Sequence, residues 1–470
     1  MTECTQTIFD FHSIGRRIVQ AGFNGGQISS DGGALLLREV DRRFGVIART
    51  AACFNDFRDP DAIEHTLHSL IAQRVFGLAL GYEDLNDHDQ LRADPLLAVV
   101  AGCSDPTGSQ RRRKQDKGCA LAGKSTLNRL ELSPADANAD SRYQKIVYIE
   151  SAFENLFVDL FLDSFAAPPD QIVFDLDATD DPIHGHQEGH FFHGYYKEYC
   201  YLPLYIFCGE QLLCAKLRTA DRDAADGSLE EVQRIAARIR ARWPNVKIVL
   251  RADSGFCRDN LMAWCEGNGV YYVFGLARNS RLEKELVDDM EAAKIWWAIT
   301  HHAARFFKDF RYQTHDSWSC ERRVIGKAEY LDKGPNPRFV VTNLPQEEID
   351  ARALYEDFYC ARGDMENRIK EQQMYLFADR TSTATMRANQ LRLWFSSVAY
   401  TLLQTLRRVG LIGTKMEKAQ CITIRLKLLK IGALVKVSVR RVLVSLAAGC
   451  PYQAIFERVY RALQNVPLRC

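Results

Sequence analysis

The amino-acid sequence predicts an α/β fold with a mixed central sheet, a helical N-terminal region and a β-rich insertion. Short apolar runs alternate with amphipathic helical segments between residues 171 and 275, which is typical of a sheet flanked by helices. The first 150 residues carry mainly helical patterns, whereas residues 280–345 are rich in aromatic and strand-forming side chains. A chain of 470 residues also exceeds the usual size of one hydrophobic core, so we expect several domains.

These changes of pattern divide the chain into five expected regions. They are a mostly helical region (1–150), the first part of the core (165–279), a β-rich insertion (280–345), the second part of the core with a long helix (346–410) and a basic C-terminal region (411–470).

The N-terminal region contains one clear helical segment and one basic loop. Residues 62–80 carry apolar side chains at helical spacing, and Gly81 ends the segment. Four basic residues follow at 111–114, in a loop that contains glycine, serine and proline. Such a run is typical of a solvated loop, and its alternative role is contact with phosphate groups.

The core is predicted element by element from apolar runs and helical periodicity. Residues 351–377 and 389–408 are predicted to form two long helices, and the strand-like runs of the insertion are 323–330 and 338–342. The elements expected between 171 and 275 are strands at 171–177, 201–207, 211–217, 246–252 and 270–275, and helices at 229–242 and 261–266.

The charge of the chain is informative only in its distribution. The 61 basic and 60 acidic residues leave a net charge of +1. Residues 418–456, however, contain seven basic residues and no acidic one, which indicates contact with a polyanion such as nucleic acid. Arg425, Lys427 and Lys430 are the DNA-binding candidates of this tail.

Several classes of protein are excluded by composition. The 14 cysteines include no Cys-x-x-Cys pair, which argues against a zinc ribbon and favours buried thiols in a reduced cytoplasm. Residues 1–17 lack the long apolar core of a secretory signal. Residues 431–448 are the most apolar late stretch, but three basic side chains interrupt them, so we expect no membrane span.

Three acidic residues are the candidates for chemistry. Alternation of side chains along a strand gives Asp175 and Asp177 the same face of the predicted strand 171–177. Asp253 follows a second predicted strand, and carboxylates at the ends of neighbouring strands converge. Glu366 lies on the predicted helix 351–377, on a helical face shared with Tyr359, Arg362, Lys370 and Gln373.

Carboxylates that converge repel one another unless cations join them. Two Mg²⁺ ions roughly 4 Å apart would join them and would also clamp the attacking and leaving oxygens of a phosphodiester. Spacing alone leaves a second interpretation open, because acids at strand ends also serve as surface or capping residues.

At these positions the sequence resembles bacterial insertion-sequence transposases of the DDE type. Asp177-Ala178-Thr179 resembles the segment with the first catalytic acid, and residues 251–256 (Arg-Ala-Asp-Ser-Gly-Phe) resemble the second. Residues 359–366 are similar to the helix signature Tyr-(2)-Arg-(3)-Glu-(6)-Lys of the hairpin-forming branch. Further segments suggest the insertion-sequence family numbered thirteen-eighty; these are 80–84, 184–187 and 387–392.

The sequence departs from this signature at one position. Gln373 stands where the signature has lysine, and Lys370, one turn earlier, is the candidate to replace it. The departure concerns the role of that lysine and leaves Glu366 in its matching position.

The resemblance implies a fold and a reaction. It implies an RNase H-like core in which Asp177, Asp253 and Glu366 are catalytic and bind Mg²⁺, with Mn²⁺ as a substitute. Metal-dependent cleavage of transposon ends would be followed by a hairpin intermediate and strand transfer into target DNA, without ATP. The expected partners are the terminal inverted repeats and target DNA, bound by a homodimer in the cytoplasm at the bacterial nucleoid.

The same resemblance suggests residues that contact DNA. Tyr359, Arg362 and Lys370 would hold phosphates near the break. Trp318, in the insertion, is the candidate for stacking on an unpaired base, and core packing is its alternative role.

Two further motifs have competing interpretations. Residues 118–125 fit the phosphate-loop pattern G-x-x-x-x-G-K-S, but the basic segment before them is no buried strand. Residues 120–131 are better explained as a turn and helix of a DNA-binding region, with Lys124, Asn128 and Arg129 available to DNA. The cluster His184, His186, His190 and His193 could bind zinc, or could serve as hydrogen-bonding or DNA-contacting histidines.

Two other functions remain open at this point. The chain could be a transposase-derived DNA-binding protein without catalysis, against which the presence of all three acids argues. It could also be an RNase H-like nuclease that cuts DNA without joining it.

Overall fold

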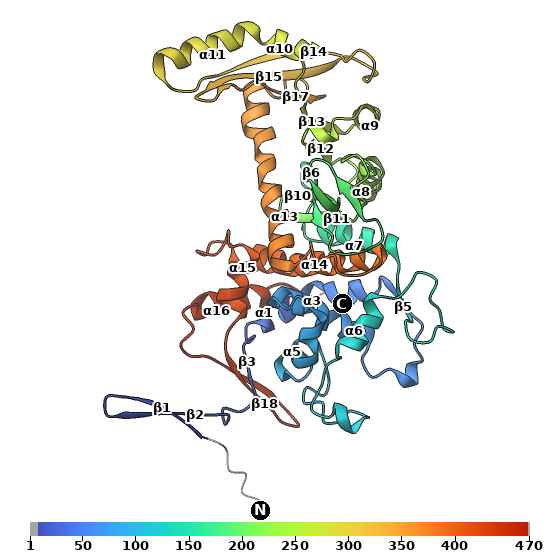
Figure 1. Ribbon diagram of the computed structural model, residues 1–470, viewed down its shortest axis with the longest axis vertical. Helices are drawn as coiled ribbons and strands as arrows, with labels where there is room; N and C mark the ends of the chain where they lie inside the picture. Colours follow the sequence, from blue (N-terminus) through green and yellow to red (C-terminus); the bar gives the residue numbers. More distant parts are fainter. Residues whose placement is uncertain (1–7, 469–470) are drawn as a thin grey trace, which may run out of the picture. The chain divides into compact units, whose positions relative to one another are not determined.

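A mixed β-sheet forms the centre of the part of the chain that carries the three acids (Figure 1). The computed structural model describes residues 8–468. The expectation that residues 1–17 are no secretory signal therefore falls partly outside the described residues. The strand order along this sheet is β11-β10-β6-β12-β13-β17-β15-β14, and β16 pairs with the strand β15. The strands are β6 (Gln171–Ala178), β10 (Leu204–Cys208), β11 (Gln211–Lys216), β12 (Lys247–Ala252), β13 (Tyr271–Leu276), β14 (Arg305–Tyr312), β15 (Arg322–Leu331), β16 (Gly334–Pro335) and β17 (Arg338–Thr342).

The directions of the strands confirm a mixed sheet. β12 pairs in parallel with both β6 and β13, whereas β10 is antiparallel to β6 and to β11. Because β6 and β12 are parallel neighbours, their carboxyl ends lie at the same edge of the sheet. The strands predicted at 171–177, 211–217, 246–252 and 270–275 are confirmed to within about two residues, and the strand predicted at 201–207 begins at Leu204.

The alternation of side chains gives the two faces of this sheet different neighbours. On one face, Ile248 and Leu250 of β12 pack in a large apolar cluster with Ile235 of the helix α8 (Ser228–Arg242). On the other face, Val249 packs with Leu354, which begins the long helical segment that carries Glu366. Side chains alternate along each strand, so Asp177 and Arg251 point to the same face of the sheet as Val249. These two side chains therefore face the helical segment that carries Glu366.

The remaining helices of this unit flank the sheet or extend it. The helices predicted at 229–242 and 261–266 are confirmed. They are α8 and α9 (Asp259–Gly267), and they are accompanied by α7 (Glu150–Leu162), α10 (Ser280–Glu285), α11 (Val287–Thr300) and the short strands β7 (Asp181–Pro182), β8 (Phe191–His193) and β9 (Glu198–Tyr201).

The prediction of a β-rich insertion is wrong for the first third of residues 280–345, whereas the remainder contains the strands β14 to β17. That first third is helical, because Leu282, Leu286 and Ala293 are buried on α10 and α11 while the polar side chains between them are exposed. The strands do not form a separate sheet, since β17 pairs antiparallel with β13 and carries β15 and β14 onto the central sheet.

The long helix predicted at 351–377 is irregular. It begins as α12 (Ala351–Ala353), passes through a π-helical turn at Leu354–Tyr359 and a 3₁₀ turn at Cys360–Arg362, and continues as α13 (Gly363–Leu376). Such departures from α-helical geometry often occur at functional sites. The second predicted helix is confirmed as α14 (Met386–Leu406).

The chain divides into two units, and the sheet belongs to the second. The first unit comprises the residues up to Ile149, Tyr375–Phe377 and the residues from Val398 onwards, and the second comprises Glu150–Met374 and Ala378–Ser397. The elements of the first unit are β1 (Ile8–Ile14), β2 (Arg17–Gly22), β3 (Ile28–Ser29), α1 (Ala34–Phe44), α2 (Val46–Ala51), β4 (Phe54–Asp56), α3 (Leu67–Leu80), α4 (His88–Leu91), α5 (Pro95–Val100), α6 (Lys124–Glu131), β5 (Ile146–Tyr148), α15 (Cys421–Ile424), β18 (Ala433–Val437), β19 (Val442–Leu446) and α16 (Gln453–Gln464).

The first unit is mainly helical, as expected, but it also contains short strands. Thr66 caps α3 by accepting a hydrogen bond from the backbone N–H of Ser69, so this helix begins five residues later than predicted. Gly81 ends it with φ of 93°, which confirms the predicted terminus.

Two expectations from composition can be compared with the described residues. Across residues 8–468, no helix is both long enough and apolar enough to cross a membrane. Among the cysteines of this range, Cys320 and Cys360 are exposed, so the expectation of buried thiols is wrong for these two.

A buried ion pair joins β6 to β12. The guanidinium of Arg251 donates to both carboxylate oxygens of Asp175 at 2.5 and 2.9 Å, and the two side chains are only 11% and 4% exposed. Arg251→Ala should leave the Asp175 charge unpaired in a buried position and lower the free energy of unfolding of this unit by about 3–5 kcal/mol. Denaturant titration of the full chain measures the loss.

The control is Arg238→Ala, which removes an exposed pair with Asp159. Its loss should stay below about 1 kcal/mol. Equal losses in the two variants would contradict the structural role assigned to the buried pair.

Candidate active site

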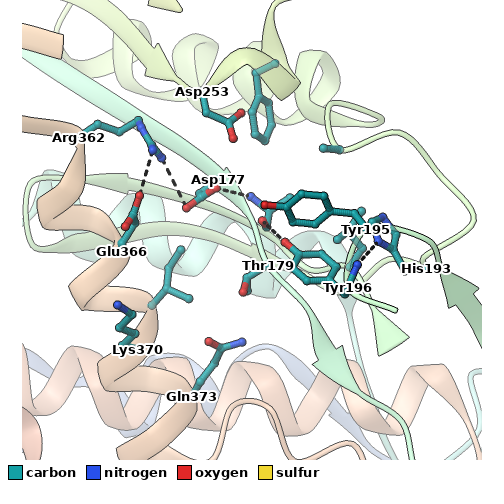
Figure 2. Close-up of a pocket in the computed structure, with 15 residues that line it drawn as sticks. Asp177, Thr179, His193, Tyr195, Tyr196, Asp253, Arg362, Glu366, Lys370 and Gln373 are labelled. Carbon is teal, nitrogen blue, oxygen red and sulfur yellow. Dashed lines mark hydrogen bonds and ion pairs between the residues drawn. The ribbon is translucent and has the colours of Figure 1, made fainter. Parts of the chain in front are cut away.

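Three segments far apart in the sequence contribute acids to one cavity. Asp177 comes from β6, Asp253 follows β12, and Glu366 lies in the first turns of α13. All three line the same cavity, of about 410 Å³. Figure 2 shows their carboxylates around it, with Asp253 on the sheet side and Glu366 on the helix.

The backbone fixes two of these carboxylates. Asp253 has extended geometry and caps the 3₁₀ turn Ser254–Phe256, with its side chain accepting a hydrogen bond from the backbone N–H of Gly255 at 2.8 Å. Asp177 accepts from the backbone N–H of Ala178 at 3.0 Å. Because each carboxylate keeps a second oxygen for the cavity, both acids can hold their positions and still bind a ligand.

Arg362 lies between two of the acids (Figure 2). Its guanidinium is 3.8 Å from a carboxylate oxygen of Asp177 and donates to Glu366 at 2.9 Å. The three- and four-residue steps of the helix bring Arg362 and Glu366 to the same side. The positive charge therefore reduces the repulsion between carboxylates that would otherwise face one another.

Burial makes Asp177 hard to ionise. Removal from water, together with the charges of Asp253 and Glu366, raises its pKa to about 7, although Arg362 acts in the opposite direction. A group with such a pKa changes its charge near neutral pH. A cation beside it would restore the ionised form.

The chemistry of these side chains fits a hard divalent cation. Carboxylate oxygens are the ligands that Mg²⁺ and Mn²⁺ prefer. The pKa of Asp177 is raised mainly by burial and secondarily by the charges of Asp253 and Glu366, and a cation would favour its ionised form. Within residues 8–468, however, no three His, Cys, Asp or Glu side chains are close enough to hold a metal ion. Binding therefore requires the carboxylates to draw together and the guanidinium of Arg362 to yield.

The residues further along α13 have separate roles. Lys370 lines the cavity and is exposed. Gln373 donates to the backbone carbonyl of Asp180 and to the carboxyl of Asp181, both at 2.9 Å, and so ties α13 to β7. The residue that departs from the transposase signature thus has a structural contact, while Lys370 offers its charge to the cavity.

Tyr359 lies beside the cavity rather than in its lining. Its ring is half-buried in the second apolar cluster, 5.7 Å from the ring of Tyr355, and burial raises the pKa of its hydroxyl.

Trp318 is enclosed by its neighbours. Only 6% of its surface is exposed, its ring packs edge-on against Tyr312 at 5.7 Å, and the guanidinium of Arg322 lies over it. These contacts correspond to core packing, the alternative role considered for Trp318. Stacking of Trp318 on a DNA base would require the segment around it to open.

The other residues predicted to contact DNA belong to the first unit. Arg425 is buried and donates to the backbone carbonyls of Leu78, Ala79 and Tyr375, so its guanidinium stabilises the fold. Lys430 forms an ion pair with Asp31 at 2.6 Å. Exposed side chains remain at Lys124, Arg129 and Lys427.

Two cavity residues, Tyr195 and Tyr196, were missed in the sequence, and a third, His193, was considered only as part of the histidine cluster. His193, Tyr195 and Tyr196 line the cavity from the β8–β9 hairpin, with Tyr195 83% exposed (Figure 2). The signal was the dense run of histidine and aromatic residues at 190–199, of which only the histidines were considered from the sequence.

The two competing motifs gain no support. Among the described residues no histidine group could hold zinc, and His190 instead stacks on Tyr199 with ring centres 4.1 Å apart. Residues 103–123 form turns and one 3₁₀ turn, so no strand precedes the G-x-x-x-x-G-K-S segment.

Comparison with known proteins identifies one family. The sequence profile of a family described as "Transposase DDE domain group 1" matches residues 11–468. A search among curated proteins finds no match.

The raised pKa of Asp177 predicts how stability depends on pH. Folding raises this pKa from 3.8 to about 7, so the folded state keeps a proton that the unfolded state has already lost between these values. Stability is therefore lost as pH rises towards 7. Without divalent cations, Asp177→Asn, which is always neutral, should raise Tm by a few degrees at pH 8 and hardly at pH 4.

Thermal unfolding of the two proteins across this range measures the difference. Asp159→Asn, on the exposed side of α7, is the control and should give no such pH dependence. An unchanged Tm difference between pH 4 and pH 8 would contradict the electrostatic description of Asp177.

Proposed function

This chain belongs to the family of transposase DDE domains, and from that premise we propose that it cuts transposon ends and joins them to target DNA. The observation that carries the proposal is the meeting of Asp177, Asp253 and Glu366 in one cavity. Because the three come from separate parts of the sequence, a merely structural or capping role for each would not bring them together.

The three acids would hold Mg²⁺, or Mn²⁺ in its place. When bound, the metal would acidify the attacking water or 3′-hydroxyl and stabilise the leaving oxygen of the phosphodiester. Asp177 must be ionised for this role, which its pKa near 7 makes dependent on pH.

The basic residues of the cavity would bind the substrate. Once Arg362 yields its contacts with Asp177 and Glu366, its planar guanidinium can take two phosphate oxygens. Lys370, which has no carboxylate partner among the described residues, would contact a neighbouring phosphate. Tyr195 and Tyr196 would limit the access of water from the side of the β8–β9 hairpin.

The finer assignments are also proposals. The strand order, with β6 antiparallel to β10 and parallel to β12, supports an RNase H-like core. The contact between Arg362 and Glu366 supports the hairpin-forming branch, in which the family numbered thirteen-eighty falls, since that signature requires the two on one helical face. Two transposon ends must meet for cut-and-paste transfer, so we propose a homodimer on DNA.

Loss of either Asp253 or Glu366 should separate cleavage from binding. In Asp253→Asn and Glu366→Gln, cleavage of labelled DNA carrying the inverted repeats that flank the gene should fall at least a hundredfold, because the metal loses a ligand. Binding of the same DNA should stay within about threefold. Asp159→Asn, in the same unit but outside the cavity, is the matched control and should cut normally.

Normal cleavage by either acid variant would refute its catalytic role. Joining of pre-cut ends to target DNA by the unmodified protein distinguishes a transposase from a nuclease. Binding without any cleavage would leave the alternative of a DNA-binding protein.

Lys370 and Gln373 should respond differently to substitution. Lys370→Ala should slow cleavage about tenfold, with partial rescue by Lys370→Arg, because a phosphate contact is lost. Gln373→Leu should lower Tm instead, because Asp180 and Asp181 lose their partner. Rate and Tm are measured on the same preparations, and the opposite pattern would contradict the roles given to these residues.

A further inference from the structure

A second cavity lies within the first unit and shares no lining residue with the cavity of Asp177, Asp253 and Glu366. It has a volume of about 540 Å³ and is lined by three segments of the chain, between residues 58 and 65, 89 and 129, and 142 and 146. Basic side chains outnumber acidic ones in its lining. The proposed catalytic function makes no use of this cavity.

Part of the positive charge is neutralised inside the unit. Arg92 pairs with Asp116 at 3.4 Å, and Arg111 pairs with Glu64 at 3.2 Å. Arg111 also contacts His65, whose pKa burial and this guanidinium lower to about 4, so the histidine adds no charge at neutral pH. These residues build the wall of the cavity.

The rest of the positive charge is unmatched. Arg113, Arg129, Arg142 and Lys145 line the cavity, and none has a carboxylate within ion-pair distance among residues 8–468. Four like charges around one space repel one another. Such an excess of positive charge attracts anions to the space.

Tyr143 holds two of these side chains in position. The guanidinium of Arg129 lies 5.1 Å from its ring centre and that of Arg142 lies 5.0 Å from it. Stacking on an aromatic ring leaves the N–H edges of a guanidinium free for oxygen acceptors. Ser125 and Thr126 add hydroxyl groups to the same lining.

We propose that this cavity binds consecutive phosphate groups of a DNA strand, with Arg113, Arg142 and Lys145 as the main contacts. The choice of DNA as the source of the phosphates rests on the proposed function. A cavity of about 540 Å³ cannot take up a double helix, so the proposal concerns a stretch of one strand's backbone. The cavity would hold DNA outside the catalytic cavity and without reading its sequence, because phosphates carry no sequence information.

The test compares two neighbouring residues of the basic run. Arg113 and Lys114 are both exposed and carry the same charge, but only Arg113 lines the cavity. Fluorescence anisotropy with the full chain, a duplex carrying one flanking inverted repeat and no divalent cation gives affinities between about 50 and 200 mM salt.

Arg113→Ala and Arg142→Ala should each weaken binding about tenfold and reduce the slope of log affinity against log salt by about 1. Lys114→Ala should change affinity less than twofold. Tyr143→Leu should weaken binding with little change in slope, because it displaces two guanidiniums without removing charge. Arg113→Gln, which removes the charge but keeps a polar side chain, should behave like Arg113→Ala. The Tm of each variant is measured to check that the fold is intact.

Equal losses for Arg113→Ala and Lys114→Ala would overturn the proposal, because the loop would then act only through its general charge. The proposal would also fail if ATP or inorganic phosphate bound in an Arg113-dependent way while duplex binding did not depend on Arg113. If the unmodified protein cuts DNA and the Arg113 variants bind DNA as tightly as it does, the proposed phosphate site is refuted and the catalytic proposal is not. Arg113-dependent binding without cleavage by the unmodified protein would refute the catalytic proposal alone.

Discussion

The parallel pairing of β6 with β12 is the constraint on which the candidate active site depends. It brings the ends of two strands, 76 residues apart at the Asp175–Arg251 pair, to one edge of the sheet. Side-chain alternation then directs Asp177 to the face covered by the helix that carries Glu366. The buried ion pair beneath them fixes this register, since a shift by one residue would reverse the faces.

The electrostatics of the cavity follow from that geometry. Three acids share one space from which water is partly excluded, so their charges must be balanced. Arg362 provides the balance in the structure, and a divalent cation would provide it in the proposed reaction. The same guanidinium can then bind phosphate, which links the arrival of metal to the binding of substrate. In the first unit the imbalance has the opposite sign, and the cavity beside Arg113 fits anions.

Apolar runs and their spacing were sufficient to predict the strands around Asp177 and Asp253. Both strands are buried, and a buried strand shows in the sequence as a short continuous run of apolar residues. The segment of α10 and α11 was mistaken for part of a β-rich insertion, because Trp296 and Trp297 favour strands locally, whereas in the fold Trp297 lies on α11 and contacts the ring of Tyr330 in β15. The acids and Arg362 came from family motifs, whereas the position of the Arg362 guanidinium between Asp177 and Glu366 depends on distances that no sequence pattern gives. The cavity lined by Arg113 and Arg142 is built from separate loops, which only the fold brings together.

The central claim is that Asp177, Asp253 and Glu366 together form one binding site for divalent cations. It is tested most directly by replacing Mg²⁺ with Fe²⁺ in the DNA-bound protein and starting hydroxyl-radical chemistry with ascorbate and peroxide, which cuts the polypeptide next to the bound iron. The account predicts cuts close to all three acids, all suppressed together by excess Mg²⁺. Cuts near only one of them, or cuts that Mg²⁺ does not suppress, would contradict it.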